Sequence, residues 1–192
     1  MSLVVSAMAP LDTWAESSEP STQAHLELRG LYSQICGTCV VLRKHNPYSA
    51  PTELGLQVYG DYLPFAFKTP LGVLHVGPYG SISMIGEIGK ISTGLAMTLR
   101  PESTSWEIFT QTGARYTSET MSYQYSGKPG AQGKTAFNLA IGARFYLNNH
   151  WYIPIAWEHD SNGSHVGVPL SEKDRSQNPG VDYIVVGFGR MF

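Results

Sequence analysis

Apolar residues alternate with polar or small ones along most of this chain, in stretches separated by turn residues. Alternation with a period of two predicts β-strands, because successive side chains of a strand point to opposite faces. The predicted strands are Ala24–Ser33, Glu53–Tyr62, Gly72–Ile85, Gly89–Leu99, Ser105–Ser118, Lys134–Leu147, Trp151–Ser161 and Val181–Phe192. For the first position, Cys39–Lys44 is an alternative to Ala24–Ser33. Strands of about 9 to 14 residues exceed the usual length in soluble sheets and suit a tilted bilayer crossing.

The two faces of the predicted strands differ in polarity, which indicates how a barrel made of them is oriented. One face of Lys134–Leu147 carries Phe137, Leu139, Ile141, Ala143, Phe145 and Leu147. The other carries Ala136, Asn138, Ala140, Gly142, Arg144 and Tyr146. A soluble barrel packs its apolar face inward, whereas a membrane barrel turns it toward lipid and keeps polar and small residues inside. Asn138 and Arg144 favour the membrane barrel, with a soluble ligand-binding barrel as the alternative.

The sequence thus predicts an all-β fold, an eight-stranded antiparallel transmembrane β-barrel of the bacterial outer membrane, formed by residues 24–192 as one domain. Residues 1–23 are interpreted as a flexible tail or the remnant of a leader. The chain ends on Phe192 with apolar residues at alternate positions before it, as is typical of the C-terminal insertion signal of such barrels.

Turn lengths predict which end of the barrel faces outward. Residues 148–150 form a tight turn, whereas residues 163–180 form a long polar loop. Short turns are periplasmic and long loops extracellular in outer-membrane barrels. We therefore expect Trp151–Ser161 to run toward the cell exterior and Val181–Phe192 to return to the periplasm.

Net charge, the length of apolar runs and the cysteine content limit the functional classes that the sequence can belong to. The net charge of −2 gives no indication of a nucleic-acid partner, and no apolar run is long enough for a transmembrane helix. Cys36 and Cys39 form a CxxC pair without a second pair of metal ligands, which favours two structural cysteines over a redox pair or half of a zinc site.

The most informative stretch is the strand Trp151–Ser161. Its outer face is predicted to carry Trp151, Ile153, Ile155, Trp157, His159 and Ser161. Asp182 shares the parity of Ile184 on the following strand, so it faces outward as well. At about 3.3 Å per residue and about 40° of tilt, His159 and Asp182 lie roughly 20 to 25 Å above the periplasmic edge of the apolar band. All three polar residues should therefore meet at the outer-leaflet end of the barrel's exterior.

A serine, a histidine and an acid on a lipid-facing surface predict acyl transfer to water. Ser161 would attack an ester carbonyl, His159 would act as base and then acid, and Asp182 would orient the imidazole. Candidate oxyanion donors are Asn162, the backbone amides of Gly163 and Ser164, and Asn178.

The other titratable residues are predicted to lie in loops, in the lumen or at the surface. Glu172 or Asp174 could replace Asp182 as the acid, and both are expected to be solvated in the loop. Glu158 and Asp160 are expected in the lumen, paired with a base such as Arg144. The remaining histidines are expected at the surface or in loops: His25, His45, His75, His150 and His165.

The residues 159–163 (HDSNG) and 178–182 (NPGVD), followed by a strand ending in Phe192, resemble the lipid A 3-O-deacylases, the PagL-type acyloxyacyl hydrolases. The family's H-x-S-N motif carries base and nucleophile and falls on His159 and Ser161. Its acid follows an N-x-G-φ element, which falls on Asp182. The family's acid is usually glutamate, and the N-terminal extension and the Cys36/Cys39 pair are not features associated with it.

This resemblance covers about the last 40 residues of the chain. It implies an eight-stranded outer-membrane barrel that removes the 3-O-linked acyl chain from the lipid A of lipopolysaccharide, without metal or cofactor. The expected partners are therefore lipopolysaccharide and outer-membrane lipid, and the active site is expected in the outer leaflet. The alternative is a non-catalytic outer-membrane barrel with a structural or adhesive role.

Overall fold

The structure, a computed structural model, describes residues 22–34, 48–49, 53–119, 121–125, 128–132, 134–161 and 181–192. The predicted N-terminal tail lies almost entirely outside this part of the chain, and Cys36, Cys39 and the alternative first strand Cys39–Lys44 lie wholly outside it. Within the described ranges, no helix is long and apolar enough to cross a membrane.

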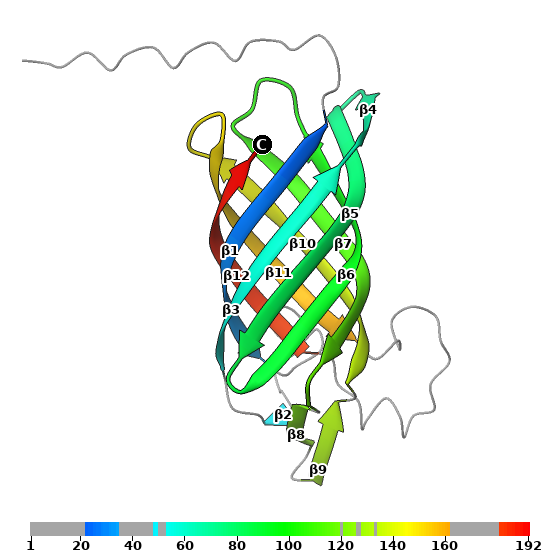
Figure 1. The fold of residues 1–192 in the computed structure, drawn as a ribbon, viewed down its shortest axis with the longest axis vertical. Coiled ribbons are helices and arrows are strands. Elements are labelled where there is room, and N and C mark those ends of the chain that lie inside the picture. The colour runs from blue at the N-terminus through cyan, green and yellow to red at the C-terminus, as the bar shows by residue number, and fades with distance from the viewer. Residues whose placement is uncertain are drawn as a thin grey trace, which may run out of the picture.

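The described residues form a closed eight-stranded antiparallel barrel, as predicted (Figure 1). Its strands are β1 (Gln23–Gln34), β3 (Leu54–Leu63), β5 (Gly72–Ile85), β6 (Ile88–Arg100), β7 (Trp106–Thr117), β10 (Thr135–Tyr146), β11 (Trp151–Ser161) and β12 (Val181–Met191). Sequential neighbours pair around the barrel, and the pairing of β12 with β1 closes it. Each predicted strand coincides with one of these to within a few residues.

Four short strands lie at the ends of the barrel. β4 (Phe65–Thr69) pairs with the first residues of β5 and lies at the same end as the C-terminus (Figure 1). β2 (Tyr48–Ser49), β8 (Met121–Tyr125) and β9 (Lys128–Gln132) form a separate small sheet beyond the opposite end. By the turn-length rule, we expect the end that carries the C-terminus to face the periplasm.

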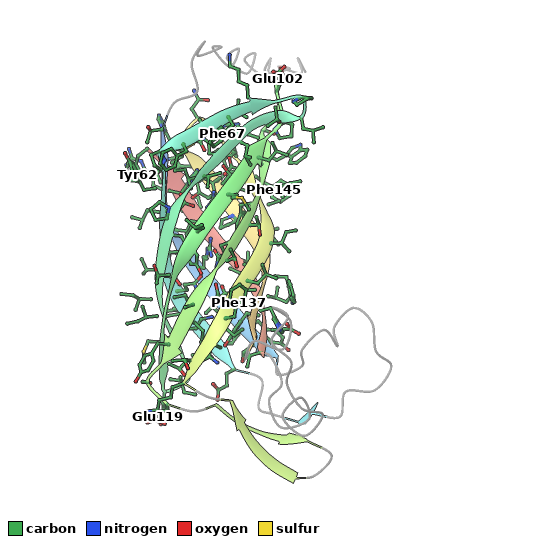
Figure 2. All side chains as sticks on the ribbon, turned by 90° about the vertical axis from the view of Figure 1, so that its right-hand side faces the viewer. Tyr62, Phe67, Glu102, Glu119, Phe137 and Phe145 are labelled. Atoms are coloured by element: carbon green, nitrogen blue, oxygen red, sulfur yellow. The ribbon has the colours of Figure 1, made fainter. Side chains whose placement is uncertain are left out.

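The polarity of the barrel is that of a membrane protein, which excludes the soluble alternative. Large apolar side chains cover its outside, among them Leu28, Val58, Ile82, Leu95, Ile141 and Val186, each at least half exposed. Figure 2 shows Tyr62 and Phe145 on the outer surface and Glu102 and Glu119 near opposite ends of the barrel. Polar and charged residues fill the lumen instead, including Glu27, Arg29, Gln57, Glu107, Asn138 and Arg144, each at most 1% exposed.

Arg144 is the centre of an ion network in the part of the lumen nearer the end of the barrel that carries the C-terminus. Its guanidinium donates to Glu27 Oε1 at 2.7 Å, Asp61 Oδ2 at 2.8 Å and Glu107 Oε1 at 2.9 Å. These carboxylates come from three different strands, so the one side chain links β10 to β1, β3 and β7 across the lumen. A buried charge is tolerated only when it is paired and hydrogen-bonded, and this network meets that condition.

Glu158 and Asp160 face the lumen and pair with interior bases, as predicted, but those bases are Lys90 and Arg115 and not the suggested Arg144. Lys90 binds both carboxylates, at 2.8 Å from Nζ to Asp160 Oδ2, and Arg115 Nε lies 3.5 Å from the same oxygen. Glu158 and Asp160 lie further along β11, toward the end of the barrel opposite the C-terminus, so bases on β6 and β7 at that level neutralise them. The strand pattern gives the direction of a side chain, whereas the cross-lumen partner depends on the stagger of the whole barrel.

Two histidines also contradict their predicted surface position. His25 and His75 are each 3% exposed and belong to inward-facing positions of β1 and β5. His25 Nδ1 lies 2.6 Å from Asp61 Oδ1 and so joins the Arg144 network. A membrane barrel places polar residues inside, and the parity of His25 with Glu27 and Arg29 would have indicated the lumen. His150 is exposed as predicted, and His45 and His165 lie outside the described residues.

Replacing Arg144 with methionine should destabilise the barrel strongly, because three buried carboxylates would lose a guanidinium partner, and only Glu27 would keep a second one, from Arg29. We expect a loss of about 3–5 kcal/mol in the free energy of unfolding, measured by urea titration in lipid vesicles. The control is Arg190→Met on the outer surface, where the guanidinium lies over the rings of Trp151 and Phe192. Equal losses in the two variants would contradict the role of the network.

The apolar exterior should make the folded protein dependent on detergent or lipid. We expect the unheated protein to migrate differently from the boiled protein on an SDS gel, because a closed barrel resists the detergent until heated. Removal of detergent should cause precipitation. A monodisperse, detergent-free protein with one gel mobility would contradict the assigned orientation.

Candidate active site

The register of the last two strands places His159 directly opposite Asp182. β11 and β12 are antiparallel, and these residues are Cα partners in the ladder. Their side chains meet, with His159 Nδ1 2.7 Å from Asp182 Oδ1. Because a carboxylate only accepts, Nδ1 is the protonated nitrogen and Nε2 is the nitrogen that can take up a proton.

The pair lies on the outer face of the barrel. On β12, the residues that share the parity of Asp182 are exposed, with Ile184 at 42%, Val186 at 50% and Phe188 at 48%. Tyr183, of opposite parity, is fully buried in the lumen, as is Glu158 beside His159. The hydrogen bond between imidazole and carboxylate therefore stands on the side of the sheet that faces lipid.

Despite this position, both side chains are shielded: His159 is 3% and Asp182 is 2% exposed. The indole of Trp157, two residues earlier on the same face, stacks on the imidazole with a centroid distance of 5.4 Å and an interplanar angle of 20°. On the neighbouring strand, Leu139 is the Cα partner of His159. The pair is thus shielded from water, so its electrostatic interactions are stronger than in bulk solvent.

An apolar groove of about 560 Å³ lies beside the pair on the outer surface. It crosses β12, β1, β3 and β5, and its walls include Ile184, Val186, Tyr32, Leu54, Leu56 and Met84. Gly30 contributes no side chain to its floor; a Cβ there would have Val186 O as its nearest neighbour, at 3.5 Å. Ile184 is the next outward-facing residue after Asp182, so the groove begins two positions from Asp182 along β12.

The structure describes only part of the predicted site. Ser161 is the last residue of β11, two positions after His159, and its side chain lies outside the described part. The remaining candidates also lie outside it: Asn162, Gly163, Ser164, Asn178, Glu172 and Asp174. Among the described residues, no group of three or more His, Cys, Asp or Glu side chains could hold a metal ion.

Two features of the site were not anticipated from the sequence. The alternation pattern put Trp157 on the same face as His159, but it did not indicate that the two rings stack. The groove could not be recognised at all, because its walls come from four strands whose relative register is set by the closure of the barrel. Gly30, an outward glycine between Leu28 and Tyr32, is the only local signal for it.

Comparison with known proteins identifies the fold and leaves the family open. No protein-family model matches the chain, and no curated protein does. Among solved structures, it is similar to the outer membrane enzyme PagL, with a TM-score of 0.58 and 12% identity over 85% of this chain and 97% of that one. A de novo designed transmembrane β-barrel gives a TM-score of 0.50 and 9% identity, over 91% and 98% of the two chains. The attachment invasion locus protein Ail of Yersinia pestis gives 0.48 and 14%, over 91% and 99%.

At these identities the likeness is one of fold alone. The barrel architecture is shared by an enzyme and by a designed scaffold, so it does not identify a reaction. Any functional conclusion has to come from the residues of the site.

The position of the pair generates a prediction about stability. A buried polar pair is often no more stable than apolar residues of similar volume, whereas removing one partner leaves the other uncompensated. The double variant His159→Leu/Asp182→Leu should therefore be as stable as the wild type or more stable, by up to about 4 kcal/mol in urea unfolding. His159→Leu alone should be less stable than the double variant. A double variant that is the least stable of the three would show that the pair is there for folding.

Proposed function

We propose that this barrel is an esterase of the outer membrane that hydrolyses the 3-O-linked acyl chain of lipid A. The observation that carries the proposal is the hydrogen-bonded pair of His159 and Asp182 on the lipid-facing surface. Ionisable residues directed toward the lipid side of a membrane protein are rare and costly, and they occur there chiefly where they have a function. A histidine oriented by an acid is the base half of a hydrolytic triad.

Ser161 is the proposed nucleophile because it follows His159 by two positions on the same strand. His159 Nε2 takes the proton of the serine hydroxyl as the oxygen attacks the ester carbonyl, and Asp182 stabilises the imidazolium that forms. The imidazolium then protonates the leaving sugar alcohol, which leaves an acyl-enzyme. Water, deprotonated by His159, attacks this ester and releases the fatty acid and free Ser161. The proposed oxyanion donors are Asn162, Asn178 and the backbone amides of Gly163 and Ser164.

The surroundings of the pair support a lipid as the substrate. The groove beside Asp182 is apolar and open to the bilayer, as an acyl chain requires. His159 is near the end of β11 and Asp182 near the start of β12, so the pair lies at the end of the barrel opposite the C-terminus, which the turn-length rule assigns to the outer leaflet. Lipopolysaccharide occupies that leaflet in the bacterial outer membrane, and the motifs around His159 and Asp182 resemble those of the lipid A 3-O-deacylases.

The experiment is incubation of purified, folded protein with lipopolysaccharide, followed by mass spectrometry of lipid A. We expect loss of one ester-linked acyl chain with the wild type. Ser161→Ala and His159→Asn should each abolish the release, because residual catalysis by a triad without its nucleophile or base is lower by orders of magnitude.

Matched controls are available at the opposite end of the barrel. Ser105 and His150 are exposed residues near the periplasmic turns, and Ser105→Ala and His150→Asn should release fatty acid at the wild-type rate. All variants should keep the heat-modifiable gel mobility. Unchanged release by a folded Ser161→Ala or His159→Asn variant would refute the triad, and no release by the wild type would favour a non-catalytic barrel.

A further inference from the structure

We propose that Trp157 is a positioning residue for the reaction: its indole holds the His159 imidazole against Asp182 and stabilises the imidazolium formed during acyl transfer. This inference rests on the proposed function, because it assigns His159 the part of general base. Trp157 belongs neither to the predicted triad nor to the predicted oxyanion donors. It acts on the imidazole of His159 in addition to the hydrogen bond between His159 and Asp182.

The geometry restrains the imidazole on two sides. Asp182 Oδ1 holds its edge through Nδ1 at 2.7 Å, and the Trp157 ring covers one face at 5.4 Å between centroids. The interplanar angle of 20° means that the two rings lie face against face. Rotation of the imidazole out of this plane would break the hydrogen bond and disrupt the stacking together. The ring is thus held in one orientation before the substrate arrives, which is how positioning contributes to rate.

The stacking also has an electrostatic consequence. The face of an indole carries negative potential and attracts a cation placed over it, more strongly than the face of a phenyl or phenol ring does. His159 is neutral before the serine is attacked and cationic in the transition state, so the attraction grows as the reaction proceeds. An interaction that is stronger in the transition state than in the ground state raises kcat. The burial of His159 enlarges this effect, because little water competes for the charge.

The alternative role for Trp157 is that of an interfacial anchor, since tryptophan is enriched at both surfaces of a bilayer. The same strand provides the matched control for that role. Trp151, also on the outer face, stacks on Phe188 with a centroid distance of 5.0 Å and an interplanar angle of 15°. It lies at the other end of β11, far from His159 in the strand. An anchoring or packing effect should therefore appear in Trp151 variants too, whereas an effect on the imidazole should not.

The kinetic test compares Trp157→Leu, Trp157→Phe and Trp151→Leu in the lipopolysaccharide assay. For Trp157→Leu we expect kcat to fall about 5- to 30-fold with KM changed less than about two-fold, because the lost interaction acts on the transition state. Trp157→Phe keeps an aromatic face and should recover most of the lost kcat. Trp151→Leu should keep the wild-type kcat. A wild-type kcat in Trp157→Leu, or an equal loss in Trp151→Leu, overturns the inference.

A second readout does not depend on catalysis. Protonated imidazole quenches the fluorescence of an indole stacked on it, so acidification of the folded wild-type protein should reduce tryptophan emission. This decrease should be absent from both Trp157→Phe and His159→Asn, and it should persist in Trp151→Leu. Absence of the decrease in the wild type, or its persistence in His159→Asn, overturns the inference.

The two readouts separate this inference from the proposed function. If the wild type shows the quenching but releases no fatty acid, the proposed function is refuted, and with it the catalytic part assigned to Trp157. If the wild type releases fatty acid but shows no quenching, the triad stands and the role of Trp157 is refuted.

Discussion

The closed hydrogen-bonded ladder of the barrel is the constraint on which the rest of this structure depends. In a bilayer no water is available to backbone amides and carbonyls, so each strand must be paired on both sides. The ladder fixes which residues face lipid and which face the lumen. It also leaves the lumen as the only place where charged side chains can gather at membrane depth, and Arg144 and Lys90 link the strands there through buried carboxylates.

Against this division, the pair of His159 and Asp182 is an exception. Every other acid described on β11 and β12 points into the lumen and meets a base there. Asp182 points outward and accepts a hydrogen bond from the His159 imidazole, on which the Trp157 indole stacks. An apolar groove lies on the same surface. Local departures of this kind from the rule that shapes the rest of a protein are where function is usually found. The same ladder register that closes β11 on β12 brings the two residues together.

The strands, their orientation and the pairing of His159 with Asp182 could be predicted because they follow from period-two alternation along single strands. The partners of Glu158 and Asp160 could not, since the contact with Lys90 crosses the lumen and depends on the stagger of the barrel. The lumenal position of His25, in contrast, follows from the sequence, because His25 shares the parity of Glu27 on the same strand. The catalytic roles of Ser161 and the oxyanion candidates stay predictions.

The filled lumen has a consequence for how this protein meets other molecules. Side chains such as Arg29, Arg144, Tyr59 and Tyr152 occupy the interior of the described barrel and are inaccessible to solvent. No molecule can pass along the axis of the barrel. Encounters with lipids therefore take place from the side, within the plane of the bilayer. Their frequency is then governed by how many lipids of a given kind surround the barrel and how fast they exchange places, rather than by a concentration in water.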